Sequence, residues 1–280
     1  MTSIYRRIAQ LKHRLLVRGE AVDPTAPSCV EDLLSSEALF LITCGRSGSK
    51  SLVDFCSRYT RMICVHAPAP WIASVGYLYH QGQISSDGAK YGFYATREPY
   101  LIDAYRRNRI FFDGDCKNLP IAAEIGELMP NAKFLHLVRR PEYFIRSGLA
   151  RGYFKTIPHE LWGHLTNSRF EIDPTLSLRE QVERIGYFWN EANRIAIAAR
   201  SKLGPDRVVT LVAESMFADP KRIIESLALL DLADVILESR DYSIRKLNVQ
   251  KSGKIISNEL NLAIEDVVRR ICTTKSLYYE

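Results

Sequence analysis

The sequence predicts an α/β fold of three layers, in which a central parallel sheet carries helices on both faces. Short apolar runs of strand length alternate with amphipathic segments of helical length along the chain. The apolar runs are nearly continuous, which is typical of strands buried on both faces of a parallel sheet. Polar clusters at 45–51, 113–118 and 139–147 follow such runs. Because parallel strands end at one edge of the sheet, these clusters predict a ligand site at that edge.

The composition indicates a folded domain with a modest preference for anions. The chain has 280 residues, of which 46% are hydrophobic, and a net charge of +6 at pH 7. We divide it into an N-terminal segment, 1–36, and a single α/β domain, 37–280, with an aromatic insert at about 71–109. The basic residues are spread along the chain and form no stripe with interleaved aromatics, which argues against a nucleic acid as partner.

The N-terminal segment is predicted to contain a helix and a linker. Residues 4–18 have apolar side chains at helical spacing and many basic ones, so we expect a basic amphipathic helix. Such a helix packs on its own domain or on a second copy of the chain, or it makes peripheral contact with an anionic membrane surface. The sequence leaves these alternatives open. Residues 19–36 contain Gly19, Pro24 and Pro27, and we expect a linker there.

The six cysteines form no CxxC pair and have no metal-ligand spacing, so we expect reduced thiols and no metal site. Cys44, Cys56 and Cys64 lie in apolar patterns, as core residues do. No apolar run reaches the roughly 18 residues that a membrane-spanning helix needs, and the N-terminus lacks the apolar centre of a signal peptide. We therefore expect a cytoplasmic protein.

Strands and helices are expected to alternate through most of the chain. The expected strands are 38–43, 61–65, a short run from Ile110, 133–138 and 207–213. The expected helices are about 49–59, 121–129, 142–150, 178–203, 220–230 and 258–271, with Asp219 as N-cap before Pro220. The insert should form helices and loops over the sheet edge. Its aromatic residues fit both an acceptor site and a local core beneath loops.

Residues 39–52 predict a buried strand, a tight loop with two glycines and a helix. Gly45 and Gly48 permit backbone angles that a Cβ would disfavour. The N–H groups of the loop and of the helix N-terminus would form a cradle for an anion, to which Arg46 and Lys50 add positive charge. We therefore expect the phosphosulfate or polyphosphate group of a nucleotide at this loop.

The loop departs from the ATP-binding Walker A pattern. That pattern has glycine directly before Lys-Ser/Thr, and Ser49 stands in this place. The pair Lys50-Ser51 is kept, so an ATP-dependent kinase of a small molecule remains an alternative. A kinase would need a magnesium-holding acid at a strand end, for which Asp113 or Asp115 could serve. A non-catalytic nucleotide-binding protein is a further alternative.

A second motif follows the strand 133–138. This strand ends in Arg139-Arg-Pro, and Ser147 comes eight residues after Arg139. Together with the glycine loop, the motif resembles the family of sulfotransferases that depend on 3′-phosphoadenosine 5′-phosphosulfate (PAPS), with a P-loop nucleotide-hydrolase-like fold. The resemblance implies that Arg139 and Ser147 bind the 3′-phosphate and that the loop binds the 5′-phosphosulfate. The residues of that loop are Gly45, Arg46, Ser47, Gly48, Ser49, Lys50 and Ser51.

The sequence departs from the family at two places that bear on catalysis. Arg46 stands where the cytosolic branch has a lysine, and a guanidinium makes forked contacts that an ammonium does not. Leu119 stands where that branch has its histidine base, two residues after the lysine that corresponds to Lys117. The base is therefore open. The resemblance implies His66 as the first candidate, because other branches of the family place a base just after the second strand, where His66 lies; the further candidates are Glu98 and Asp115.

The resemblance implies transfer of a sulfuryl group from PAPS to a hydroxyl or amine. We expect a carbohydrate or glycolipid acceptor, although the aromatic insert would also suit a phenol. No metal is expected, because loop N–H groups and side chains would handle the charge. The residues expected to act in catalysis are Arg46, His66 and Lys117. Residues 251–254 are expected to form either a lid over the 3′-phosphate or a solvated turn, and His136 is expected in the core.

Overall fold

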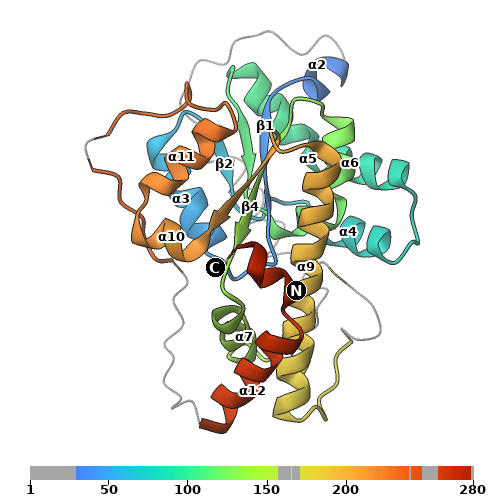
Figure 1. Ribbon diagram of the computed structural model, residues 1–280. Coiled ribbons are helices and arrows are strands. Elements are labelled where there is room, and N and C mark those ends of the chain that lie inside the picture. Colours follow the sequence, from blue (N-terminus) through green and yellow to red (C-terminus); the bar gives the residue numbers. More distant parts are fainter. Residues whose placement is uncertain (1–29, 157–164, 166–170, 240, 248–257, 279–280) are drawn as a thin grey trace, which may run out of the picture.

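The structure is a computed structural model, which describes residues 30–156, 165, 171–239, 241–247 and 258–278 (Figure 1). These residues form a parallel sheet of five strands in the order β2-β3-β1-β4-β5. The strands are β1 (Ala38–Ile42), β2 (Ile63–Val65), β3 (Phe111–Asp113), β4 (Lys133–Val138) and β5 (Val208–Val212). The helix expected at 4–18 and the turn expected at 251–254 lie outside the described residues.

Helices cover both faces of this sheet (Figure 1), which confirms the predicted fold class. One face carries α3 (Ser49–Tyr59), α10 (Ala213–Ala218) and α11 (Lys221–Leu229). The other carries α4 (Ala73–His80), α5 (Ser86–Arg106), α6 (Ala122–Leu128), α7 (Pro141–Leu149), α9 (Leu178–Leu203) and α12 (Asn258–Arg270). Alternate residues of β1 divide between the two cores, because successive side chains of a strand point to opposite faces. Leu39 belongs to the core of the first face and Phe40 to that of the second.

The glycine loop lies where the chain leaves neighbouring strands towards opposite faces of the sheet. The loop after β1 leads into α3 on the first face, whereas the loops after its neighbours β3 and β4 lead to helices on the second face. Chain segments that leave adjacent strands in opposite directions open a crevice beyond the carboxyl ends of the strands, where ligands of such sheets bind. The glycine loop therefore lies where a ligand is expected on topological grounds.

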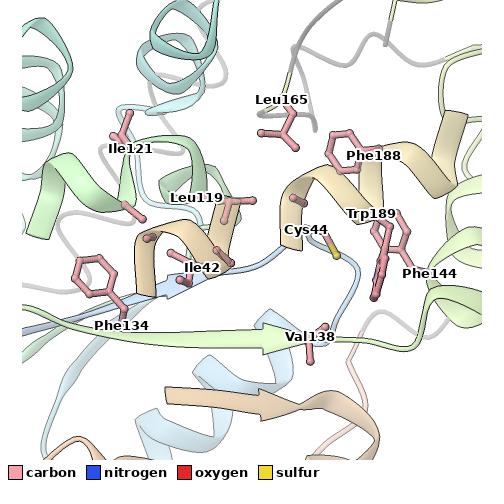
Figure 2. Packing of buried hydrophobic residues seen from close by; sticks show 14 of the residues in the cluster. Ile42, Cys44, Leu119, Ile121, Phe134, Val138, Phe144, Leu165, Phe188 and Trp189 are labelled. Atoms are coloured by element: carbon pink, nitrogen blue, oxygen red, sulfur yellow. The ribbon is translucent and has the colours of Figure 1, made fainter. Parts of the chain in front are cut away.

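A buried apolar cluster supports the carboxyl ends of β1 and β4 (Figure 2). Cys44, two residues after β1, belongs to one cluster with Val138 of β4, Phe144 of α7 and Trp189 of α9. The Trp189 Nε1–H also donates a hydrogen bond of 2.9 Å to the carbonyl of Arg139. Packing and a hydrogen bond together thus fix the residue that follows β4.

The aromatic insert forms two helices, α4 and α5, and part of it is a local core, one of the two uses that the sequence left open. Phe93 of α5 is fully buried and packs edge-on against Phe40 of β1, with ring centroids 5.3 Å apart. Tyr100 stacks on Phe111 of β3 at 5.6 Å. Trp71, by contrast, is 55% exposed. The insert is thus partly a local core and partly an exposed aromatic surface.

Two expectations about local structure are corrected. The expected linker 19–36 contains the short helix α2 (Val30–Leu34), which is favoured by acidic residues in its first turn and by the buried Leu33. The expected helix 121–129 is preceded by a 3₁₀ helix, η1 (Cys116–Ile121), because the Asp115 side chain accepts the N–H of Lys117 and caps that turn.

Other boundaries shift by a residue or two. β2 begins at Ile63 rather than at residue 61, because Arg61 bonds through its N–H to the carbonyl of Val235. The helix α10 was not expected, since its six residues are too few for a periodic signal. The N-cap of α11 is Pro220, although the Asp219 carboxylate accepts the N–H of Lys221 at 3.1 Å, close to its expected role.

Candidate functional site

The glycine loop after β1 is built from residues with left-handed backbone angles. Gly45, Arg46 and Gly48 have φ values of 79°, 55° and 94°. The two glycines adopt such angles without strain, whereas a residue with a Cβ does so at an energetic cost. A strained non-glycine residue persists when its surroundings fix it, and such residues concentrate at functional sites. In this loop, Arg46 is the non-glycine residue with such a left-handed backbone angle.

Internal hydrogen bonds hold the loop in shape. The Thr43 hydroxyl donates to Ser47 Oγ at 3.1 Å, and the Ser47 hydroxyl donates to the carbonyl of Gly45 at 3.0 Å. Ser47 is buried, so its hydroxyl supports the loop rather than facing a ligand. Ser51 is also buried, and its Oγ accepts the N–H of Leu247 at 3.0 Å. Of the predicted loop hydroxyls, Ser49 is the accessible one.

The N-terminus of α3 offers unpaired backbone donors. Its N-cap is Gly48, which has no side chain to accept them, and its first turn carries no acidic residue. The first N–H groups of a helix have no partner within the helix and attract anions. Lys50 in this turn is exposed, and no carboxylate of the described residues forms an ion pair with it. The anion cradle at this helix N-terminus stays a prediction, for which these groups would supply the donors.

The second motif meets this loop directly. Arg46 Nε donates to Ser147 Oγ at 3.2 Å, and Arg139 Nη1 donates to the carbonyl of Arg46 at 2.7 Å. Arg139 follows β4, and Ser147 lies on α7. The structure thus brings Arg46 together with Arg139 and Ser147, which lie 93 and 101 residues further along the sequence.

The charges in this cluster are all positive. Burial lowers the pKa of Arg46, and the nearby charges of Arg151 and Arg139 act in the same direction. Within the described part of the chain, no carboxylate forms an ion pair with Arg46, Arg139 or Arg151. An arginine without an acidic partner in a half-buried position is suited to an anionic ligand. We call Arg46, Arg139, Ser147 and Arg151 the basic pole.

Arg151 is the residue of this pole that the sequence analysis missed. It lies two residues beyond the end of α7, and its N–H bonds to the carbonyl of Gly148 at 3.1 Å. The signal was present, because Ser147 and Arg151 are four residues apart and such residues share one side of a helical turn. No family motif drew attention to that spacing.

His66 lies beside the opposite side of the loop. It follows β2, is exposed, and has its Nε2 at 3.0 Å from Ser49 Oγ, in the first turn of α3. A ring nitrogen within hydrogen-bond distance of the cradle can exchange a proton with a group held there. Of the base candidates, His66 is thus the one that contacts the glycine loop.

Lys117 lies under the exposed Trp71. The lysine is 7% exposed, and its Nζ is 5.1 Å from the centroid of the Trp71 ring. Its neighbour Cys116 faces the loop, since a Cβ built on Gly45 would lie 3.7 Å from Cys116 Sγ. A buried ammonium covered by an indole is positioned to meet a ligand group that approaches along this ring.

The acidic base candidates are placed less favourably. Asp115 and Asp113 are buried and contact the guanidinium of the fully buried Arg97, at 3.4 Å and 2.6 Å. Burial raises the pKa of Asp113, while the Arg97 charge lowers it. Glu98 accepts a hydrogen bond of 2.7 Å from the Tyr94 hydroxyl. Burial raises the pKa of that tyrosine, and its hydrogen bond to Glu98 acts in the same direction, so Glu98 already has a partner within α5.

The remaining expectations concern the core and possible metal or membrane contacts. His136 is buried, as predicted, with Nε2 at 3.1 Å from Asn193 Oδ1, and burial lowers its pKa to about 4. The described residues contain no group of three or more His, Cys, Asp or Glu side chains that could hold a metal ion. None of the described helices is both long enough and apolar enough to span a bilayer.

Comparisons with known proteins give similarities in structure. No model of a known protein family matches the chain, and no curated protein matches it either. A sulfotransferase from Alicyclobacillus acidocaldarius is 13% identical, with a TM-score of 0.49, over 88% of this chain and 97% of that one.

Two further similar structures are sulfotransferase domains. The sulfotransferase domain of the Synechococcus PCC 7002 olefin synthase is 14% identical, with a TM-score of 0.47, over 88% of this chain and 95% of that one. The sulfotransferase domain of the curacin biosynthetic pathway is 15% identical, with a TM-score of 0.43, over 72% and 75%.

Proposed function

We propose that this protein transfers a sulfuryl group from PAPS to a hydroxyl or amine of an acceptor. The observation that carries the proposal is the contact between the two motifs. Arg46 of the glycine loop donates to Ser147, and Arg139 donates to the backbone of Arg46. PAPS has two anionic ends, and the basic pole together with the α3 N-terminus offers donors for both.

The residues present fit such a donor. The α3 N–H groups and the exposed Lys50 would hold the 5′-phosphosulfate, while Arg139 and Ser147 would hold the 3′-phosphate. Arg46 would stabilise the negative charge that develops on the phosphate oxygen as its bond to sulfur breaks. Its buried, strained position favours this role, because preorganised donors need no reorganisation during the reaction.

His66 is proposed as the general base. The acceptor oxygen or nitrogen forms a bond to sulfur, the sulfur–oxygen bond to the phosphate breaks, and the imidazole takes the acceptor proton. His66 contacts Ser49 and is exposed, so an acceptor can reach it from solvent. Lys117 would act on the same side of the loop, next to the exposed ring of Trp71.

A carbohydrate or glycolipid acceptor forms part of the proposal. The exposed ring of Trp71 offers an apolar surface of the kind on which a sugar ring packs, next to the Lys117 ammonium. A cytoplasmic location is also proposed. The described cysteines are free thiols, as is usual in a reducing compartment.

The kinase alternative gains no support from the acids that it would need. Asp113 and Asp115 would have to hold magnesium, yet both carboxylates already contact Arg97. A cation placed on them would compete with that buried guanidinium. We therefore put the sulfuryl-transfer proposal first.

Isothermal titration calorimetry separates the two functions. We expect adenosine 3′,5′-bisphosphate to bind the full chain without magnesium, and ATP to bind weakly with or without it. Transfer from radiolabelled PAPS to a panel of sugars, glycolipids, phenols and amines would then identify the acceptor. Magnesium-dependent ATP binding, with no binding of the bisphosphate, would reject the proposal.

A further inference from the structure

The turn that follows α7 holds Arg151 against the site. The N–H groups of Arg151 and Tyr153 both bond to the carbonyl of Gly148, each at 3.1 Å. The turn includes Gly152 and Phe154 with φ values of 68° and 62°. Phe154 is fully buried, so this left-handed angle in a bulky residue is enforced by packing. The turn is therefore a fixed support for the side chain of Arg151.

The guanidinium of Arg151 has an unsatisfied donor. Its Nε is buried and has no hydrogen-bond partner among the residues that the structure describes. A buried donor without a partner costs free energy, and more so in a charged group. A role as a simple counter-charge to the C-terminal dipole of α7 would leave the guanidinium hydrated or bonded to helix carbonyls. The geometry indicates that a partner is missing.

Arg151 also lies close enough to Arg46, the arginine of the glycine loop, for their charges to interact. Its charge disfavours the protonated form of Arg46, and both arginines act on the buried Tyr153 hydroxyl. Arg46 in turn contacts Ser147, four residues before Arg151. The charges of Arg46 and Arg151 thus act on each other's surroundings, and no carboxylate of the described residues forms an ion pair with either of them.

We infer that Arg151 is a further binding residue for the phosphate that Ser147 receives, which under the proposed function is the 3′-phosphate of the nucleotide. Arg139 and Arg151 then approach this phosphate from β4 and from the turn after α7. A dianionic group satisfies the buried Nε and neutralises the repulsion between the arginines. A terminal phosphate monoester, with two charges near neutral pH, suits the site better than a singly charged diester. The inference thus makes Arg151 a specificity residue for a 3′-phosphorylated nucleotide.

The test compares Arg151→Gln with wild type for two nucleotides in calorimetry. The variant should bind adenosine 3′,5′-bisphosphate ~10- to 100-fold more weakly, as expected for loss of a hydrogen bond to a charged group. Its affinity for adenosine 5′-monophosphate, which lacks the 3′-phosphate, should change little. Arg151→Lys keeps the charge without the fork and should recover part of the affinity. Arg222→Gln, an exposed arginine of α11, has the same change in net charge and serves as the control.

Thermal unfolding of the free protein distinguishes a binding role from a structural one. Arg151→Gln should leave the Tm unchanged or raise it by ~1–3 °C, because it removes a like charge beside Arg46. A lowered Tm with both nucleotides weakened alike would overturn the inference, as would unchanged binding of the bisphosphate.

Inorganic phosphate separates this inference from the proposed function. Phosphate should raise the Tm of wild type and of Arg222→Gln more than that of Arg151→Gln. If this holds while neither nucleotide binds, the proposed function fails and Arg151 remains a phosphate contact. If wild type and Arg151→Gln transfer sulfuryl groups and bind the bisphosphate equally, the inference fails alone. A wild type that responds to none of the three probes overturns both.

Discussion

Two arginine centres lie at the same edge of the sheet and are neutralised in opposite ways. Arg97 of α5 is fully buried at the end of β3, where its guanidinium contacts Asp113, Asp115 and the carbonyl of Pro70. The basic pole lies after β1 and β4, where the guanidinium of Arg46 bonds to a serine hydroxyl and that of Arg139 to a backbone carbonyl. The charge of Arg97 is compensated by carboxylates of the protein itself, whereas the basic pole has an excess of positive charge among the described residues.

The difference supports a structural role for Arg97 and, under the proposed function, a ligand-binding role for the basic pole. A buried charge is tolerated when partners compensate it, and Arg97 has two carboxylates. The arginines of the basic pole are half-buried and have no such partners among the described residues. Burial lowers the pKa of Arg46, and the charges of Arg151 and Arg139 act in the same direction. Stability is reduced where function requires such a site. Substitution of Arg97 should therefore lower the free energy of unfolding, whereas substitutions in the basic pole should lower activity or nucleotide binding.

The largest effect is expected from Arg97→Met. This change leaves two buried carboxylates without their cation and should lower the free energy of unfolding by about 3–5 kcal/mol. Urea denaturation measures it. Arg107→Met, at the end of the same helix, breaks a partly exposed pair with Asp103, whose side chain is 33% exposed, and should cost less than about 1 kcal/mol. A loss in Arg97→Met as small as that of Arg107→Met would contradict a structural role for the buried centre.

Arg46→Ala should spare stability and impair the reaction. Loss of one preorganised donor typically reduces kcat by ~100- to 1,000-fold, whereas removal of a charge next to Arg151 and Arg139 relieves repulsion. Sulfuryl transfer from labelled PAPS and thermal unfolding are measured on the same sample. Arg222→Ala is the control for charge. If Arg46→Ala lowers the Tm as much as Arg97→Met does, the proposed contrast between a structural centre and a functional one is wrong.

His136 is, like Arg97, a buried polar residue whose partners are side chains of the protein itself. Burial lowers its pKa from 6.5 to about 4, so the unfolded chain binds a proton more readily than the folded one between these values. Stability is then complete above about pH 6.5 and falls by about 3 kcal/mol as the pH drops towards 4. Urea titrations at pH 7.5 and 4.5 measure this change.

The variant His136→Gln keeps a neutral hydrogen-bonding side chain beside Asn193 and Thr210. It should be less stable than wild type at pH 7.5 but lose less stability at pH 4.5, because its side chain takes up no proton. An equal loss of stability in both proteins would show that the acid sensitivity originates in other groups.

The sequence was sufficient to predict elements with strong local signals. β4 (Lys133–Val138) and α9 (Leu178–Leu203) were predicted with their observed bounds, since a continuous apolar run and a long apolar stripe need no tertiary information. The six-residue α10 has no such period. The left-handed angles at Gly45 and Gly48 could be predicted as well, because glycine commonly marks such turns.

The site could be predicted as a list of residues but not as a set of contacts. Arg46 and Ser147 meet because β1 and β4 are neighbours in the sheet, and this order follows from long-range packing. Arg97 gave no signal, because nothing in α5 itself shows that two carboxylates after β3 lie beneath it. Arg151 was missed for a similar reason, since its significance depends on where Arg46 points.

The smallest effect is expected at the rim of the basic pole. Tyr143 of α7 is 48% exposed, and its ring centroid lies 5.8 Å from the guanidinium carbon of Arg139. An exposed cation–π contact of this kind contributes about 0.5–1 kcal/mol. Tyr143→Leu should therefore weaken binding of adenosine 3′,5′-bisphosphate by only ~2- to 5-fold, and Tyr143→Phe should bind like wild type. A loss of more than ~10-fold in Tyr143→Leu would mean that the ring contacts the nucleotide itself. In that case, the nucleotide site would include Tyr143 of α7 in addition to the four residues of the basic pole.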